Sequence, residues 1–410
     1  MIRLILVNIL FLISLLAVSK APAYYLWLLA IGVTEFPLLF AGITSVVLIA
    51  GVWFQKYQAA STIIGVLALL LFLSPIVRSY VVASSLKKDF VTAFGPGSAG
   101  INGDSTQAPF SFFKLFKAKP VAAYRSLVYN TGKEVPLSLN FYPSAISGKK
   151  PCIVSVHGGS WAGGDNSELP ELNSYLAQQG YNVAAINYRL APKYQTPSPI
   201  MDVAEAFAYL KAHADELHID TNSFVLMGRS AGAQIALLYA YTHSEPGLKG
   251  VIDFYGPADM VWGYSVPSNK WIMDSRKVME NYIGGAYPAV PQKYLDCSPL
   301  EFVGKQSVPT LLLHGSNDVL VSPEHSRRLD KRLAENNIKH FWLQLPWATH
   351  GFDYNLYGPG GAIINLRGRT FYKNRNQITC TKQLSLATAL WYSTTKPTPT
   401  FVGCLPPCNK

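Results

Sequence analysis

One serine in this chain has the surroundings of a catalytic nucleophile. Ser230 lies in the motif Gly-Arg-Ser-Ala-Gly, which follows the β-rich stretch Phe224–Met227 and precedes a helical run. Glycines at Gly228 and Gly232 allow the backbone to crowd into a strained strand-to-helix turn that exposes the serine hydroxyl. The start of the helix then offers unpaired N–H groups to a developing oxyanion. The pattern predicts nucleophilic catalysis by Ser230.

A second glycine motif predicts an oxyanion-binding loop. His157-Gly158-Gly159-Ser160 directly follows the apolar stretch Cys152–Val156. Glycines after a strand let the chain turn with its N–H groups directed into a cavity. We expect the backbone of Gly158 or Gly159 to act together with that of Ala231, the residue after the nucleophile. Losing one such donor typically costs about 3 kcal/mol of transition-state stabilisation.

The acid and the base follow two further strand-like stretches. Asp318 comes just after the apolar run 310–313, and His350 comes after the stretch 341–345. A neutral imidazole can take the serine proton, and a carboxylate fixes the imidazole tautomer and stabilises its cation. The chain order Ser230, Asp318, His350 differs from the orders of the two common serine protease classes. These three residues are the predicted catalytic triad.

The elements that must position these residues alternate along the chain. Short β-rich stretches occur at 124–129, 137–142, 152–156, 183–188, 224–227, 251–254, 310–313 and 341–345. Helical patterns such as Pro199–Glu216 lie between several of them. This alternation predicts an α/β fold with a mostly parallel eight-stranded sheet covered by helices on both faces, and the first two stretches are close enough for an antiparallel edge hairpin.

Three apolar segments at the N-terminus predict a membrane region. They cover residues 4–18, 24–54 and 59–77, and the second is broken at Glu35 and Pro37, where we expect a helix break at the membrane interface. An open alternative is a cleaved signal peptide ending at Ala21-Pro22-Ala23. With three spans, more basic residues flank the catalytic side than the other side, which favours a cytoplasmic catalytic domain.

The predicted domain plan has four parts. Residues 1–80 form the transmembrane region of about three helices, 81–120 a linker or lid, 121–395 the catalytic domain and 396–410 a tail. The catalytic domain includes a cap insertion at about 258–300 and a basic inserted loop at about 362–382. Cys404 and Cys408 in the tail either pair or remain thiols. Aromatic residues of the cap either roof an acyl pocket or pack ordinarily: Trp262, Tyr264, Trp271, Tyr282 and Tyr287.

From about Val121 to His350 the chain resembles the hormone-sensitive-lipase-like (Aes-like) carboxylesterases of the α/β-hydrolase superfamily, including prenylcysteine-methylesterase-like members. The stretches 187–192 (Asn-Tyr-Arg-Leu-Ala-Pro) and 254–259 (Phe-Tyr-Gly-Pro-Ala-Asp) add to the likeness. The resemblance implies hydrolysis of carboxylic esters by the predicted triad, without metal or organic cofactor, and a supporting role for His157 in orienting the oxyanion loop. The motif His-Gly-Gly-Ser departs from the His-Gly-Gly-Gly form and weakens a lipase assignment.

The amino-acid composition limits the kinds of molecule that the chain is expected to bind. The formal charge is +11 and charged residues make up only 14% of the 410 residues, but lysine and arginine are scattered and no nucleic-acid motif occurs. An anionic membrane surface is the simpler partner for this charge, together with a small or lipid-like ester as substrate. An amidase, formamidase or acyltransferase with the same triad remains an alternative, as does a catalytically silent receptor or scaffold on the same fold. The oligomeric state is not indicated.

Overall fold

The computed structural model describes residues 1–53, 57–95, 121–130 and 135–364. Within these ranges eight strands form one sheet in the order β1-β2-β4-β3-β5-β6-β7-β8. The strands are β1 (Arg125–Asn130), β2 (Leu137–Tyr142), β3 (Lys150–Val156), β4 (Asn182–Ile186), β5 (Ile219–Arg229), β6 (Leu248–Phe254), β7 (Thr310–Gly315) and β8 (His340–Leu345). All eight predicted strands are therefore present.

The sheet is antiparallel at one edge and parallel elsewhere. β1 pairs with β2, and β2 with β4, in antiparallel register, so the predicted edge hairpin is confirmed. From β4 onward every pairing is parallel. The central strands β3 and β4 are mostly apolar and have no solvent-exposed face, which is the pattern of strands buried on both sides. Their carboxyl ends lie at one edge, where ligands bind in open α/β sheets.

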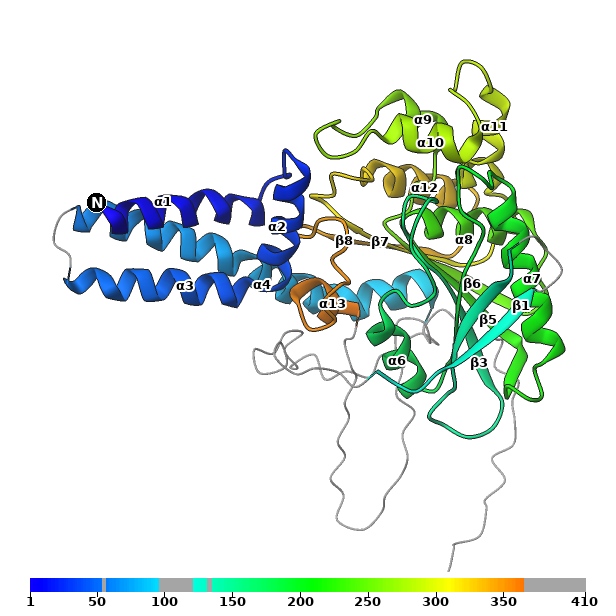
Figure 1. Ribbon diagram of the computed structural model, residues 1–410. Helices are drawn as coiled ribbons and strands as arrows, with labels where there is room; N and C mark the ends of the chain where they lie inside the picture. Colours follow the sequence, from blue (N-terminus) through cyan, green and yellow to red (C-terminus); the bar gives the residue numbers. More distant parts are fainter. Residues whose placement is uncertain (54–56, 96–120, 131–134, 365–410) are drawn as a thin grey trace, which may run out of the picture.

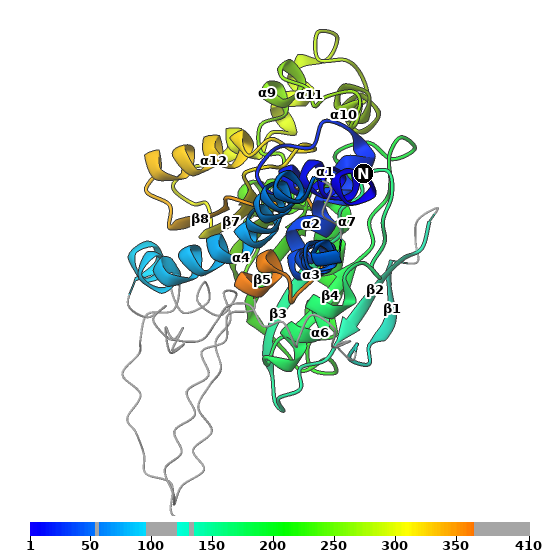
Figure 2. The same cartoon turned by 90° about the vertical axis from the view of Figure 1, so that its left-hand side faces the viewer.

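Helices cover both faces of the sheet (Figures 1 and 2). One apolar core includes side chains of α7 (Ser198–Ala212), α8 (Ala231–Thr242) and α12 (Glu324–Glu335). A second core, on the other face, includes side chains of α6 (Pro170–Gln178), α13 (Pro359–Ile364) and the carboxyl-terminal part of α4 (Gln58–Phe94). The predicted fold class is confirmed.

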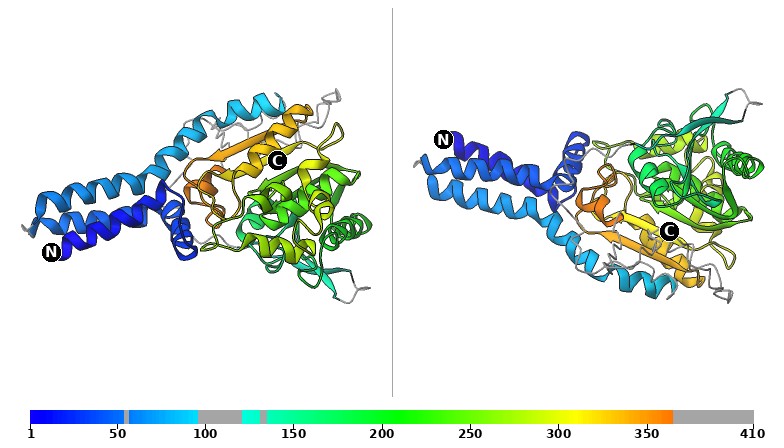
Figure 3. Two further views of the ribbon diagram at one scale, coloured as in Figure 1. Left: turned by 90° about the horizontal axis from the view of Figure 1, so that it is seen from above. Right: turned by 90° about the horizontal axis from the view of Figure 1, so that it is seen from below.

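The N-terminal helices form a rod that projects from the sheet region (Figures 1 and 3). Its helices are α1 (Ile2–Ser14) with the 3-10 turn η1 (Leu15–Ala17), α3 (Pro37–Ala50) with η2 (Gly51–Trp53), and the first half of α4. α2 (Tyr24–Glu35) lies at the base of the rod, and the bend between α2 and α3 is 87°. The predicted helix break at Glu35 and Pro37 is confirmed.

One described helix is long and apolar enough to cross a membrane. It is the segment Gln58–Leu86 of α4, and the bent pair α2 and α3 counts as a second only if both helices belong to one broken span. α1 and α3 are shorter than the roughly 20 residues that a bilayer core requires. Three full-length spans, as expected from the sequence, are therefore not found in the described part of the chain.

α4 also corrects the expected linker. Residues 81–94 continue the helix instead of starting a linker at 81, and Leu86, Phe90 and Phe94 are buried in the second core. The ring of Phe90 packs edge-on against Phe341 of β8 at 5.1 Å. Apolar residues at positions 86, 90 and 94 are four apart and fall on one helix face, which explains why the helix continues onto the sheet.

The insertion at 258–300 is present as a helical cap. It consists of α9 (Met260–Ser265), α10 (Ser275–Ile283), α11 (Pro291–Asp296) and the turn η4 (Pro299–Phe302), which Figure 1 shows at one end of the sheet region. The short helix α13 extends over the first three residues of the predicted basic loop. The rest of the predicted linker, most of the basic loop and the tail with Cys404 and Cys408 lie outside the described residues.

Candidate active site

Ser230 lies on a sharp turn between β5 and α8. Its backbone has φ 51° and ψ −119°, a conformation that a side-chain-bearing residue adopts only under strain, and its N–H donates to Phe254 O at 2.9 Å. A Cβ on Gly228 would lie 2.3 Å from Gly232 O, and one on Gly232 would lie 2.2 Å from His157 O. Both glycines are required because backbone atoms occupy the space that a side chain would need.

The structure brings the three predicted triad residues together. His350 Nε2 lies 3.1 Å from Ser230 Oγ, and His350 Nδ1 lies 2.7 Å from Asp318 Oδ2. Because an ionised carboxylate only accepts hydrogen bonds, Nδ1 carries the proton and Nε2 is free to accept the serine proton. The three residues follow the carboxyl ends of β5, β7 and β8; β7 and β8 are adjacent in the sheet, and β6 lies between β5 and β7.

The Asp318 carboxylate is buried but well supplied with donors. Its Oδ1 accepts the N–H groups of Leu320 and Val321, each at 2.9 Å. Its Oδ2 also lies 3.2 Å from Nε2 of His314, a residue not predicted to belong to the site. Burial raises the pKa of Asp318, but the two neighbouring histidines outweigh it and hold that pKa well below its usual value. The carboxylate is therefore ionised at neutral pH.

His157 lies behind the oxyanion loop. Its ring stacks on Tyr188 at 4.2 Å, and its Nδ1 lies 2.8 Å from Gly158 O. Burial lowers the pKa of His157 to about 4, so the ring is neutral at neutral pH. The Tyr188 hydroxyl donates to the carbonyls of His157 and Gly158, both at 3.2 Å. These contacts hold the backbone of the loop in one orientation.

The predicted oxyanion donors differ in their hydrogen bonds. Gly158 N donates to Glu168 Oε2 at 3.3 Å, so this amide is already engaged. In the described part of the chain, no protein atom accepts a hydrogen bond from the backbone amides of Gly159 or Ala231. A Cβ on Gly158 would lie 3.5 Å from Ser230 Cβ, which places the loop directly against the serine. Gly159 and Ala231 thus carry the amides available to an oxyanion.

A buried ion pair supports the serine and histidine loops. Arg229 Nε donates to Asp353 Oδ2 at 2.6 Å, and the Tyr255 hydroxyl donates to the other oxygen of Asp353. The Tyr255 ring packs against His350 at 4.3 Å. Sequence reasoning missed these residues and Glu168, because their roles depend on contacts between distant loops. Only the position of Arg229 inside the serine motif was a local signal.

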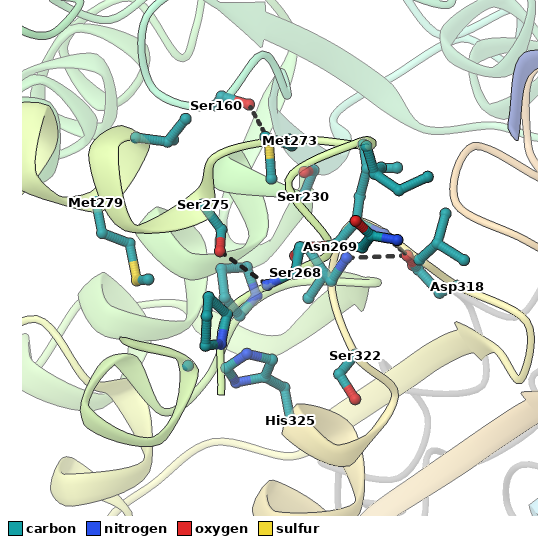
Figure 4. Close-up of a pocket in the computed structure, with 18 of the residues that line it drawn as sticks. Ser160, Ser230, Ser268, Asn269, Met273, Ser275, Met279, Asp318, Ser322 and His325 are labelled. Atoms are coloured by element: carbon teal, nitrogen blue, oxygen red, sulfur yellow. Dashed lines mark hydrogen bonds between the residues drawn. The ribbon is translucent and has the colours of Figure 1, made fainter. Parts of the chain in front are cut away.

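Two cavities meet at Ser230. The larger, of about 440 Å³, lies between the triad and the cap, and Figure 4 shows Ser160, Ser230, Met273 and Met279 around it. The smaller, of about 280 Å³, adjoins His350. Both have residues of the N-terminal region among their lining.

The cap lines the larger cavity with aliphatic residues, methionines and the polar Ser268, Asn269 and Ser275, and not with the aromatics considered for the roof. Tyr282 is fully buried and stacks on Trp161, whereas Trp271 is 80% exposed. None of the five aromatics proposed for the roof lines either cavity, so the alternative of ordinary packing describes them. The aliphatic lining comes from the same insertion: Val266, Pro267, Ile272, Met273, Val278 and Met279.

Known proteins are similar to this chain in sequence and in fold. The sequence model of the BD-FAE family matches residues 139–333. The chain is 31% identical over 220 residues to esterase LipC of Mycobacterium tuberculosis, covering 50% of this chain and 53% of LipC. It is 32% identical over 138 residues to the isoprenylcysteine α-carbonyl methylesterase of Arabidopsis thaliana, covering 34% and 32% of the two chains.

These matches support an α/β-hydrolase esterase family for the chain. The solved structure of a bacterial heroin esterase shares the fold of this chain with a TM-score of 0.52 and 21% identity, covering 62% of this chain and 86% of that one. The chain spans about half the length of LipC. Among its described residues, no group of three or more histidine, cysteine or acidic side chains is arranged to hold a metal ion.

Proposed function

We propose that this hydrolase is a membrane-anchored serine carboxylesterase that forms an acyl-enzyme on Ser230. The observation that carries the proposal is the contact of His350 with both Ser230 and Asp318, next to two unoccupied backbone amides. The esterase family and the names of its relatives agree with ester hydrolysis.

The reaction has two acyl-transfer steps. Ser230 Oγ forms a bond to the ester carbonyl carbon as its proton passes to His350 Nε2. The amides of Gly159 and Ala231 stabilise the oxyanion, the bond to the leaving alcohol breaks, and His350 returns the proton to the alcohol oxygen. Water then attacks the acyl-enzyme, with His350 as base, and releases the carboxylic acid and the free serine. The ionised Asp318 stabilises the imidazolium in both steps.

Membrane anchoring is supported by the surface of the N-terminal rod. Large apolar side chains of α1, α3 and α4 are exposed there: Ile5, Ile9, Leu12, Leu39, Ile43, Val46, Ile63, Leu70 and Val77. Such a surface is unfavourable in water and matches the interior of a bilayer. We place the boundary between the anchor and the catalytic region within α4. Because Lys20, Arg78 and Lys88 lie toward the catalytic region, we assign that region to the cytoplasmic face.

A fluorophosphonate probe tests the proposal, since it reacts with activated serines. Membranes carrying the native chain, Ser230→Ala and Ser322→Ala are labelled in parallel; Ser322 lines the same cavity and serves as the matched control. We expect labelling of the native chain and of Ser322→Ala, and none of Ser230→Ala. An unlabelled native chain would refute the enzyme assignment, and labelling of Ser230→Ala would refute Ser230 as the nucleophile.

A further inference from the structure

The N-terminal region forms part of the wall of the active site. Lys20, Ala21 and Pro22, which precede α2, line the larger cavity together with Ser230. Tyr24 and Trp27 of α2 line the smaller cavity together with His350. The catalytic centre is therefore enclosed partly by the segment that leads out of the apolar rod.

Hydrogen bonds fix this segment to both the cap and the catalytic loop. Asn269 Nδ2 of the cap donates to Pro22 O at 3.2 Å, and Tyr24 N donates to the cap carbonyl of Trp271 at 3.0 Å. The buried indole N–H of Trp27 donates to His350 O at 3.2 Å. These contacts place the base of the rod directly beside the site.

A second set of contacts docks the carboxyl-terminal end of α2 on the segment that follows His350. The buried Glu35 Oε2 accepts the N–H of Gly360 at 3.0 Å, and Asn355 Nδ2 donates to Glu35 O at 3.1 Å. Val319 and Leu320, beside the catalytic Asp318, pack against the apolar core of the rod. Because hydrogen bonds hold both ends of α2 on the catalytic region, the distance between the active site and the rod is fixed.

The larger cavity is suited in volume and lining to bind an aliphatic chain. Its volume of about 440 Å³ lies in the range of small-molecule pockets, and most of the cap residues that line it are aliphatic or methionine, with Ser268, Asn269 and Ser275 as the polar ones. Both Ser230 and the exposed residue Lys20 line this cavity. An acyl chain in this cavity would extend from Ser230 between the cap and the base of the rod.

We propose that the substrate is a long-chain fatty acyl ester resident in the bilayer, and that it reaches Ser230 from the membrane along the wall formed by residues 20–27. This inference rests on the proposed function, since it names the substrate class of the same serine. Transfer of a long chain from bilayer to cavity exchanges one apolar environment for another, whereas passage through water would expose every methylene at a cost of about 0.8 kcal/mol each.

The test compares two esters that share the same leaving group, 4-methylumbelliferyl palmitate and 4-methylumbelliferyl acetate. The full chain is reconstituted in phosphatidylcholine vesicles, and vesicle lipid is increased while the bulk amount of palmitate ester stays constant. We expect the rate on the palmitate ester to fall in proportion to its mole fraction in the bilayer, below saturation. The rate on the water-soluble acetate should follow its bulk concentration.

A bulky substitution at the wall gives an independent measurement. We expect Lys20→Trp to lower the ratio of kcat/KM for the palmitate ester to kcat/KM for the acetate by about tenfold or more, the scale at which hydrophobic sites discriminate substrates. Lys305→Trp is the matched control: this exposed residue precedes β7, at the sheet edge opposite the site, and its ratio should equal the native one.

The outcomes separate the inference from the function on which it rests. Hydrolysis of the acetate without hydrolysis of the bilayer-resident palmitate would overturn the inference and leave the esterase intact. A palmitate rate that follows bulk concentration, or an unchanged ratio in Lys20→Trp, would overturn the route along the wall. If the native chain hydrolyses neither ester and takes no fluorophosphonate label, the proposed function itself fails.

Discussion

Replacing Trp27 with phenylalanine removes one hydrogen bond between the N-terminal region and the loop of His350, the proposed catalytic base. The indole N–H donates to His350 O at 3.2 Å, and the exposed fractions of the two residues are 8% and 7%. A buried carbonyl left without its donor costs about 1–3 kcal/mol. If the whole cost falls on the catalytic position of His350, kcat decreases by about 5- to 160-fold.

The assay is steady-state hydrolysis of 4-methylumbelliferyl acetate. We expect Trp27→Phe to lower kcat with little change in KM, because the lost bond orients the base and does not contact this small ester. Trp53→Phe is the control, since Trp53 is 75% exposed at the end of η2 and lies away from the site. A kcat equal to that of the control would refute the coupling between α2 and the catalytic histidine. A fall in unfolding midpoint with kcat unchanged would assign Trp27 a structural role only.

Three further predictions follow from the site. Asp318→Asn should lower kcat on the same ester by about 10⁴-fold at unchanged circular dichroism, because an amide favours the wrong imidazole tautomer; a loss below tenfold would contradict the role of this carboxylate. Gly232→Ala should reduce the free energy of unfolding in denaturant by about 1–3 kcal/mol or more, since its Cβ would lie 2.2 Å from the carbonyl of His157, whereas Gly304→Ala has open space and should behave as native. Burial lowers the pKa of His157 to about 4 and that of His325 to about 3, against an ordinary value of 6.5. The unfolded chain takes up these protons at higher pH than the folded chain, so the free energy of unfolding should fall below about pH 6.5, by roughly 1 kcal/mol per pH unit for each histidine. A pH-independent unfolding midpoint between pH 6.5 and 4.5 would contradict this.

The strands and the order of the catalytic motifs could be predicted from the chain because they depend on neighbours in sequence. Aliphatic runs of five to seven residues formed the buried parallel strands, and the glycines at 228 and 232 marked the turn at Ser230. The three triad residues lie in loops after such strands, and parallel strands bring their carboxyl ends to one edge. Local pattern was therefore sufficient to place Asp318 and His350 near Ser230.

The sequence by itself thus determined the sheet, its edge hairpin and the apolar character of the N-terminal region. Only the tertiary structure decided that residues 81–94 continue a helix onto the sheet, that Glu168 engages the amide of Gly158, and that Trp27 binds the loop of His350. The physical reason is range: strand and turn formation are set by residues a few positions apart, whereas these contacts join residues as much as 323 positions apart. No local pattern specifies such a partner, because it is chosen by how the helices pack once the sheet has formed.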